Sequence, residues 1–182
     1  MKKILVVAPH ADDEVFGLGG YIYKSTQEGA WADLIIVAMG GVKHSHLTKL
    51  ATVKNRLKEM NSSADIIGFR KRIILFKGKD MIMDSVTQFD IISKLDKIID
   101  DGAYDEVFIP YPSHNRDHQI TFKACWAALR IKPGKAPIKF IASYEYPFVS
   151  WTYEPLLGGK LYVDIGKIMK IKTKALSCYK SQ

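Results

Sequence analysis

A short polar cluster near the start of the chain has the residue types of a hydrolytic metal site. It consists of His10, Asp12, Asp13 and Glu14. An imidazole and adjacent carboxylates are costly to bury unless a charge neutralises them, and a divalent cation would do so. Adjacent carboxylates also diverge from one backbone turn, so one can bind metal while the other faces an attacking water. The alternative is an acidic cap at the start of a helix, where carboxylates are favoured.

A second group of such residues occurs late in the chain, where His118 follows an apolar run at 107–109, as His10 follows one at 4–8. If these runs are the first and fourth strands of a doubly wound sheet, they flank the position where ligands bind. This topology predicts that His118 lies beside His10 and Asp13. Two imidazoles and one carboxylate leave coordination positions open, as catalytic zinc sites do. Asp12 would then be the unbound carboxylate that accepts a proton from the attacking water.

Apolar runs and amphipathic segments alternate along the rest of the chain, without internal repeats. Short β-branched runs predict buried strands, and apolar residues at steps of three and four predict helices. The sequence therefore predicts an α/β fold, a Rossmann-like three-layer sandwich with a mainly parallel five- or six-stranded sheet. The predicted strands are 4–8, 34–38, 73–76, 107–109, 138–144 and a short edge strand at 161–163. The predicted helices are 21–28 after a glycine cluster, 50–67, one opened by a capping box at 85–88, one running through 120–129, and a lysine-rich one at the end.

Composition limits the class of protein. A chain of 182 residues with 47% hydrophobic content fits a single domain over residues 1–182. The net charge of +8 favours an anionic partner, but the lysines are spread along the chain, which favours a basic solvated surface over a nucleic-acid face. We expect no membrane span, because no apolar run is long enough. With two distant cysteines and an N-terminal apolar run too short for a signal peptide, we expect a cytoplasmic protein.

Several motifs together resemble one family, the PIG-L/LmbE-like N-deacetylases, zinc hydrolases that remove acetyl groups from N-acetylglucosamine-type conjugates. The P-H-x-D-D-E loop of that family is met in full at residues 9–14. Its R-x-x-E motif is similar to residues 56–59, and its aspartate after the third strand to Asp80. Its second metal motif is similar to residues 117–118, and its closing K-x-x-A-L-x-x-[HY]-x-S-Q motif to residues 172–182.

The resemblance implies roles for particular residues. His10, Asp13 and His118 would bind Zn²⁺, with Fe²⁺ or another divalent ion as the alternative, and Asp12 would be the general base. Arg56 would hold anionic or hydroxyl groups of the substrate, and we place two more carboxylates, Glu14 and Asp80, on the substrate side. The substrate implied is a small N-acetyl sugar conjugate carrying negative charge.

The chain departs from the family pattern in two places. A histidine that usually stands three residues before the metal-binding histidine is replaced by Asn115, and His114 stands one residue earlier. We expect His114 to serve the oxyanion or the leaving amine while Asn115 caps the next helix; the opposite assignment stays open. Family members also continue past the S-Q motif, so we expect a domain without the usual C-terminal extension.

Other functions remain as alternatives. The same chemistry could act on a nucleotide sugar, a glycolipid or a modified nucleobase. Two histidines and a carboxylate also form the site of non-haem iron oxygenases, although those are mostly β-barrels and need no second carboxylate. The net charge of +8 motivates a non-catalytic nucleotide- or nucleic-acid-binding module, which would leave both metal motifs unexplained. Assembly into a homo-oligomer is left open.

Overall fold

Strands and helices alternate along the chain, as the apolar pattern predicts. The structure, a computed structural model, describes residues 1–41, 51–145 and 159–181. Leu50, the first residue of the predicted second helix, and the final Gln182 of the closing motif lie outside these ranges. The strands are β1 (Lys3–Ala8), β2 (Trp31–Met39), β3 (Phe69–Lys77), β4 (Glu106–Pro110) and β5 (Phe140–Tyr144). The α-helices are α1 (Asp13–Gln27), α2 (Val53–Ile67), α3 (Gln88–Gly102), α4 (Arg116–Ala128) and α5 (Met169–Leu176), with 3₁₀ turns η1 (Met83–Ser85) and η3 (Gly166–Ile168).

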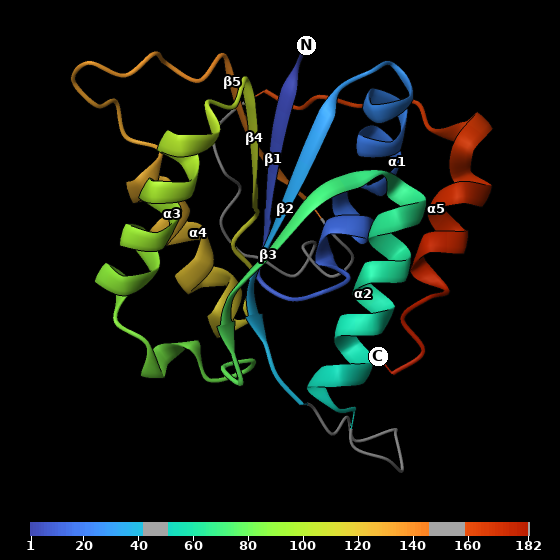
Figure 1. The fold of residues 1–182 in the computed structure, drawn as a ribbon, viewed down its shortest axis with the longest axis horizontal. Coiled ribbons are helices and arrows are strands. Elements are labelled where there is room, and N and C mark those ends of the chain that lie inside the picture. Colours follow the sequence, from blue (N-terminus) through green and yellow to red (C-terminus); the bar gives the residue numbers. More distant parts are fainter. Residues whose placement is uncertain (42–50, 146–158, 182) are drawn as a thin grey trace.

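The five described strands form one sheet in the order β3-β2-β1-β4-β5, and every neighbouring pair is parallel. Figure 1 shows α3 and α4 on one face of this sheet and α1, α2 and α5 on the other. The predicted three-layer α/β fold with a parallel sheet is confirmed. No helix among the described residues is both long and apolar enough to cross a bilayer.

The central strand β1 shows why the apolar runs are continuous. Ile4 and Val6 belong to the core beneath α1, α2 and α5, whereas Leu5 and Val7 belong to the core beneath α3 and α4. All four side chains are fully buried. Because helices cover both faces of a parallel sheet, its inner strands carry apolar residues without alternation.

The predicted start of the first helix is wrong. Helix α1 begins at Asp13, where the Asp12 carbonyl accepts hydrogen bonds from the amides of Val15 and Phe16. The glycine cluster therefore lies inside the helix rather than before it. At Gly17 a Cβ would lie 2.2 Å from the Tyr144 ring, so glycine there allows the helix to pack closely against the end of β5.

Two smaller predictions are also wrong. Helix α3 is capped by Thr87, whose hydroxyl accepts from the Asp90 amide at 3.1 Å, whereas Ser85 closes the preceding 3₁₀ turn. Residues 161–163 form no strand, and the side chains of Leu161 and Tyr162 are exposed. The sheet therefore has five strands in the described part of the chain, and β3 and β5 are its two edges.

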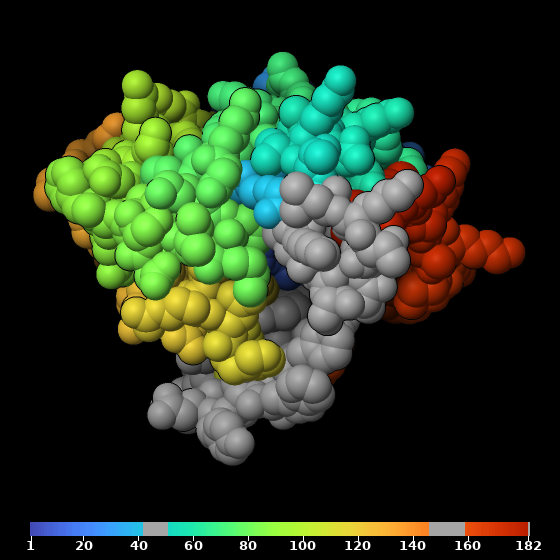
Figure 2. All heavy atoms as spheres, turned by 90° about the horizontal axis from the view of Figure 1, so that it is seen from below, coloured from blue at the N-terminus to red at the C-terminus, as the bar shows by residue number. Residues whose placement is uncertain are grey.

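The fold directs both polar loops to one end of the sheet. His10 follows β1, and the loop leading to His118 follows β4, so both lie at the carboxyl ends of neighbouring strands. In Figure 2, which views this end, blue residues from the start of the chain are visible in a hollow between the green and yellow segments. This is the sheet position at which open α/β folds bind ligands.

Candidate metal centre and active site

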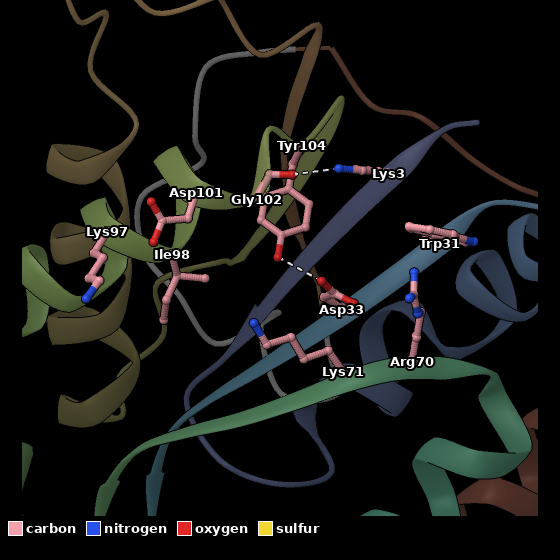
Figure 3. A pocket seen from close by; sticks show the side chains of 10 residues that line it. All are labelled: Lys3, Trp31, Asp33, Arg70, Lys71, Lys97, Ile98, Asp101, Gly102 and Tyr104. Carbon is pink, nitrogen blue, oxygen red and sulfur yellow. Dashed lines mark hydrogen bonds between the residues drawn. The ribbon is translucent and has the colours of Figure 1, made fainter.

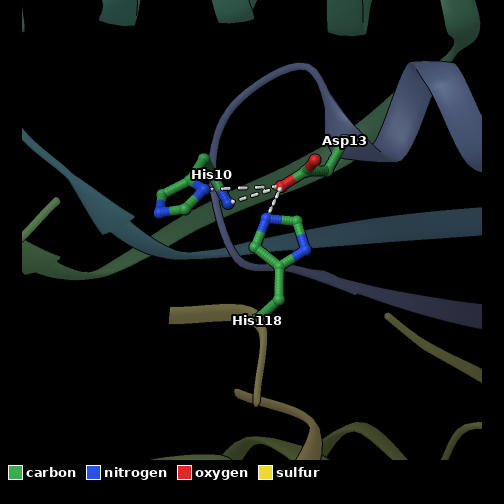
Figure 4. A group of neighbouring side chains, drawn as sticks. All are labelled: His10, Asp13 and His118. Carbon is green, nitrogen blue, oxygen red and sulfur yellow. Dashed lines mark hydrogen bonds and ion pairs between the residues drawn. The ribbon is translucent and has the colours of Figure 1, made fainter. Parts of the chain in front are cut away.

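Three buried side chains from the two loops converge on one point. His10 follows β1, Asp13 is the first residue of α1, and His118 lies in the first turn of α4. Asp13 Oδ2 is 3.3 Å from His118 Nε2 and 3.6 Å from His10 Nδ1, as Figure 4 shows. The structure thus brings the three predicted ligands together from positions over a hundred residues apart in the chain.

The donor set of this cluster fits a divalent cation. One ligand atom from each of His10, Asp13 and His118 can be chosen so that all lie within 4.8 Å of one another. Imidazole nitrogens with a carboxylate oxygen are the donors of catalytic zinc sites and of several other first-row metals. The burial of all three residues also requires that the carboxylate charge be neutralised.

A second carboxylate holds His10 in place for this role. His10 Nε2 is 2.9 Å from Asp117 Oδ2, so Nδ1 is the ring nitrogen that faces Asp13. The Asp117 carboxylate also accepts hydrogen bonds from the backbone amides of Met81, at 2.7 Å, and Met83, at 3.1 Å. Metal-binding histidines commonly bond a carboxylate through their other nitrogen, which fixes the ring orientation. Asp117 is thus a positioning residue that the sequence analysis missed, although the Asp-His pair at 117–118 was its signal.

The charges around the cluster distinguish the two imidazoles. Burial lowers the pKa of His10, but the hydrogen bond to Asp117 and the charge of Asp13 outweigh it, so the pKa is raised. Burial and the neighbouring His10 together lower the pKa of His118, although Asp13 acts against them. Burial would raise the pKa of Asp117, but the hydrogen bond and charge of His10 keep it below its usual range. The lowered pKa favours the neutral form of the His118 imidazole, which is the form that binds metal.

Asp12 stands at the N-cap position of α1 but does not cap the helix with its side chain. Its side chain makes no capping hydrogen bond to α1, so the alternative of a simple helix cap is wrong. Its backbone has φ 118° and ψ −33°, a conformation that costs L-residues about 1–3 kcal/mol and that clusters at functional sites. Burial and the nearby charges of Asp13 and Glu14 raise the pKa of Asp12 well above its usual value. A cation bound nearby would lower the pKa of Asp12.

Glu14 lies behind the Asp12 loop and not on its open side. Its side chain is fully buried; one oxygen accepts the Asp12 amide at 3.0 Å and the other accepts the Tyr179 hydroxyl. Burial raises the pKa of Glu14 to about 7, against the lowering effect of these bonds. The structure therefore does not place Glu14 where we predicted a substrate contact. Instead, Glu14 links the strained loop to the segment after α5.

We predict that Tyr179→Phe loosens the Asp12 loop. The substitution leaves one oxygen of the buried Glu14 without its donor, and hydrogen bonds to charged groups contribute about 1.5–3 kcal/mol. We therefore expect a fall of that size in the free energy of unfolding, and a lower kcat with unchanged metal content, measured by denaturation, kinetics and elemental analysis. The control is Tyr162→Phe, whose ring is exposed. Wild-type stability and kcat in Tyr179→Phe would contradict this role.

Arg56 and Asp80, both predicted to contact substrate, form a buried ion pair with each other. The Arg56 guanidinium also donates to the Gly40 carbonyl at 3.2 Å, and Asp80 Oδ1 lies 3.5 Å from His10 Nε2. Arg56 does not pair with Glu59, which accepts from Ser181 Oγ at 2.6 Å. The Nε of Arg56 is buried and has no hydrogen-bond partner among the described residues. A substrate contact by either residue stays a prediction.

Asn115 caps the next helix, as the preferred assignment predicts, whereas the role of His114 is not tested. The Asn115 side chain caps α4 by accepting the Asp117 amide at 2.9 Å, as predicted. His114 is exposed, and its charge contributes to lowering the pKa of His118. The role of His114 at the oxyanion stays a prediction.

Paired alanine variants separate these two residues. We expect His114→Ala to lower kcat by about tenfold or more, because a general acid or oxyanion donor is lost. We expect Asn115→Ala mainly to cost stability, about 1 kcal/mol for a lost helix cap. Kinetics and thermal melts of both variants decide between them. A fully active His114→Ala beside a stable, inactive Asn115→Ala would reverse the assignment.

Comparison with known proteins agrees with this site. The family model described as PIG-L, GlcNAc-PI de-N-acetylase, matches residues 5–129, which include both loops. The diacetylchitobiose deacetylase of Thermococcus kodakarensis is 25% identical over 195 residues, covering 100% of this chain and 70% of that protein. A probable N-acetyl-alpha-D-glucosaminyl L-malate deacetylase 2 of Bacillus cereus is 24% identical over 191 residues, covering 100% and 84%.

Comparison with solved structures also finds a deacetylase of similar fold. The N,N'-diacetylchitobiose deacetylase of Pyrococcus horikoshii matches with a TM-score of 0.77 at 25% identity, covering 100% of this chain and 70% of that one. The family model covers more than half of the chain and includes all three residues of the candidate metal-binding cluster, His10, Asp13 and His118. The chain belongs to the PIG-L family of GlcNAc de-N-acetylases.

Proposed function

We propose that this protein is a metal-dependent hydrolase that removes the acetyl group from an N-acetylglucosamine-type sugar. The observation that carries the proposal is the convergence of His10, Asp13 and His118 at one point. The neighbouring Asp12 side chain makes no capping hydrogen bond to α1. The parallel α/β sheet and the additional carboxylate of Asp12 favour hydrolysis over the oxygen chemistry of two-histidine iron sites.

The metal would be held by His10 Nδ1, His118 Nε2 and an oxygen of Asp13. Zinc bound there lowers the pKa of water toward neutrality and polarises a carbonyl group. Asp117 keeps the His10 ring in the orientation that this binding needs. Three protein donors would leave coordination positions open, as catalytic zinc sites do.

The remaining steps are performed by residues of the chain. Asp12 accepts a proton as water adds to the acetamide carbon, and the carbonyl oxygen becomes an oxyanion. His114 donates a hydrogen bond to that oxyanion. As the carbon–nitrogen bond breaks, Asp12 or His114 delivers a proton to the departing nitrogen. The products are acetate and a sugar with a free amine.

The related deacetylases support an N-acetyl sugar as the substrate, since those named above act on diacetylchitobiose or are named for an N-acetylglucosaminyl malate. The buried Nε of Arg56 supports recognition of a hydroxyl or anionic group nearby. A nucleotide sugar, a glycolipid or a modified nucleobase would need the same metal and base but different contacts around them.

An amine-release assay tests the proposal. The protein, loaded with Zn²⁺ or Fe²⁺ in separate samples, is incubated with N-acetylglucosamine, diacetylchitobiose, an N-acetylglucosaminyl malate and a non-sugar acetamide. We expect free amine from at least one sugar, and no such product with Asp12→Asn. Absence of amine from every sugar in metal-loaded protein would refute the proposal.

A further inference from the structure

A cavity lies at the opposite end of the sheet from the candidate metal-binding cluster. It has a volume of about 610 Å³ and is lined by the first residues of β1, β2 and β3 and by the end of α3. The cluster follows the last residues of β1, and a six-residue strand at about 3.3 Å per residue places the two on the order of 20 Å apart. The cavity is therefore separate from the proposed active site.

Positive charge is in excess in this cavity. Its lining includes four basic residues, Lys3, Arg70, Lys71 and Lys97, but only two carboxylates, Asp33 and Asp101. One carboxylate, Asp33, is already engaged as acceptor of the Tyr104 hydroxyl at 2.9 Å. Within the described ranges, no carboxylate lies within ion-pair distance of the Arg70, Lys71 or Lys97 side chains.

A β-bulge directs two adjacent cations into the cavity. The register between β2 and β3 passes from Ala32 opposite Phe69 to Asp33 opposite Lys71, so Arg70 is an extra residue. In a regular strand neighbouring side chains point to opposite faces, but a bulge re-aims one of them. Figure 3 shows Arg70 and Lys71 leaving β3 on the same side. The bulge therefore directs both side chains to the cavity side of β3, with the Arg70 guanidinium toward Trp31 and the Lys71 ammonium toward α3.

Two of the cations are also held in position. The Arg70 guanidinium carbon lies 3.6 Å from the centroid of the Trp31 ring, which limits its freedom. Lys3 Nζ donates to the Gly102 carbonyl at 3.2 Å. At Gly102 a Cβ would lie 2.0 Å from the Tyr104 ring, so glycine there lets this ring form part of the cavity wall. Ordered cations lose less conformational entropy when they bind a ligand.

We propose that this cavity binds a small phosphate-bearing anion. The cations approach from β1, β3 and α3, and the several oxygens of a phosphoryl group can accept from all three directions, whereas a single carboxylate has two oxygens in one plane. Arginine forks and lysine ammonium groups are the usual protein donors to phosphate. Because the charged ends of Arg70, Lys71 and Lys97 are spread along the cavity, a diphosphate, which has more charge and more oxygens than one phosphate, can be contacted by more of them.

Isothermal titration calorimetry with pyrophosphate at low ionic strength tests the site. We expect saturable binding of one pyrophosphate per chain in this cavity, and Arg70→Gln and Lys71→Gln each to weaken it by about tenfold, the usual effect of losing a charged hydrogen bond. The matched control is Lys123→Gln, an exposed lysine of α4 outside the cavity, which should change the affinity by less than twofold. Far-ultraviolet spectra of the variants verify that they fold.

Two results would overturn the proposal. Pyrophosphate binding that persists unchanged in both Arg70→Gln and Lys71→Gln would place the anion elsewhere, for example on a metal at the His10 cluster. A single-stranded oligonucleotide that binds more tightly than pyrophosphate, with the same dependence on Lys71, would make the cavity part of a nucleic-acid face. Neither result depends on the deacetylase activity, so the two proposals fail separately.

Discussion

Asp12→Asn is expected to lower kcat by about 10²–10⁴-fold, the usual loss on removing a general base. The substitution keeps the size and hydrogen-bonding shape of the side chain but removes its capacity to accept a proton. Because Asp13 rather than Asp12 belongs to the metal-binding cluster, the metal content should stay at the wild-type level. Steady-state kinetics on a substrate found by the amine-release assay, together with elemental analysis, measure both quantities.

The matched control for this variant is Asp65→Asn, which removes an exposed carboxylate of α2 paired with Arg72. Exposed ion pairs contribute about 0–1 kcal/mol, so this control should keep both its stability and its kcat. If Asp12→Asn retained the kcat of the wild type, the base would have to be another residue. Loss of metal together with activity would instead make Asp12 a ligand.

His118→Ala is expected to abolish stoichiometric metal binding and, with it, activity. Only one carboxylate and one imidazole would remain in the cluster, and His10 alone would supply nitrogen. The measurement is elemental analysis after removal of metal with a chelator and reloading with Zn²⁺. His118→Gln, closer in volume to histidine, guards against loss of metal through misfolding, and thermal melts compare the two variants.

Asp117→Asn provides a graded comparison with that variant. Asp117 contacts His10 rather than the proposed metal position, and loss of such a supporting carboxylate typically weakens metal binding by about 10–100-fold. The variant should therefore bind metal at saturating concentrations but release it to a weaker chelator than the wild type does. Full stoichiometric metal in His118→Ala would refute the ligand assignment, and unchanged affinity in Asp117→Asn would remove the positioning role.

The sequence was sufficient to predict the layers of this fold. Continuous apolar runs such as 4–8 and 34–38 can only be buried on both faces, which requires a parallel sheet between helices. Their alternation with amphipathic segments then limits the topology, because crossover connections between parallel strands are nearly always right-handed. Predictions from local sequence were wrong where tertiary packing determined the conformation. Gly17 was predicted to precede the first helix, but it lies inside α1, where it makes room for the Tyr144 ring, a partner far away in the chain.

The sequence also predicted which residues meet, because strand order alone places the loops after β1 and β4 side by side. His10, Asp13 and His118 were chosen on that basis, and the structure brings their ligand atoms together. The sequence could not show whether the Asp12 carboxylate caps α1, because this depends on the backbone conformation of Asp12, whose φ is 118°. The backbone angle follows from loop packing, which is not encoded in local spacing.

The tertiary structure alone decided the roles of the residues around this cluster. Glu14 stands in the same motif as Asp12 and Asp13, yet it is fully buried because Tyr179, 165 residues later, closes over it. Asp117 orients His10 through contacts 107 residues apart in sequence. Such partners are set by the way α1, α4 and the segment after α5 pack on the sheet. Residue type and spacing determine which reactions the side chains could support. Long-range packing determines which atom of each side chain faces the site.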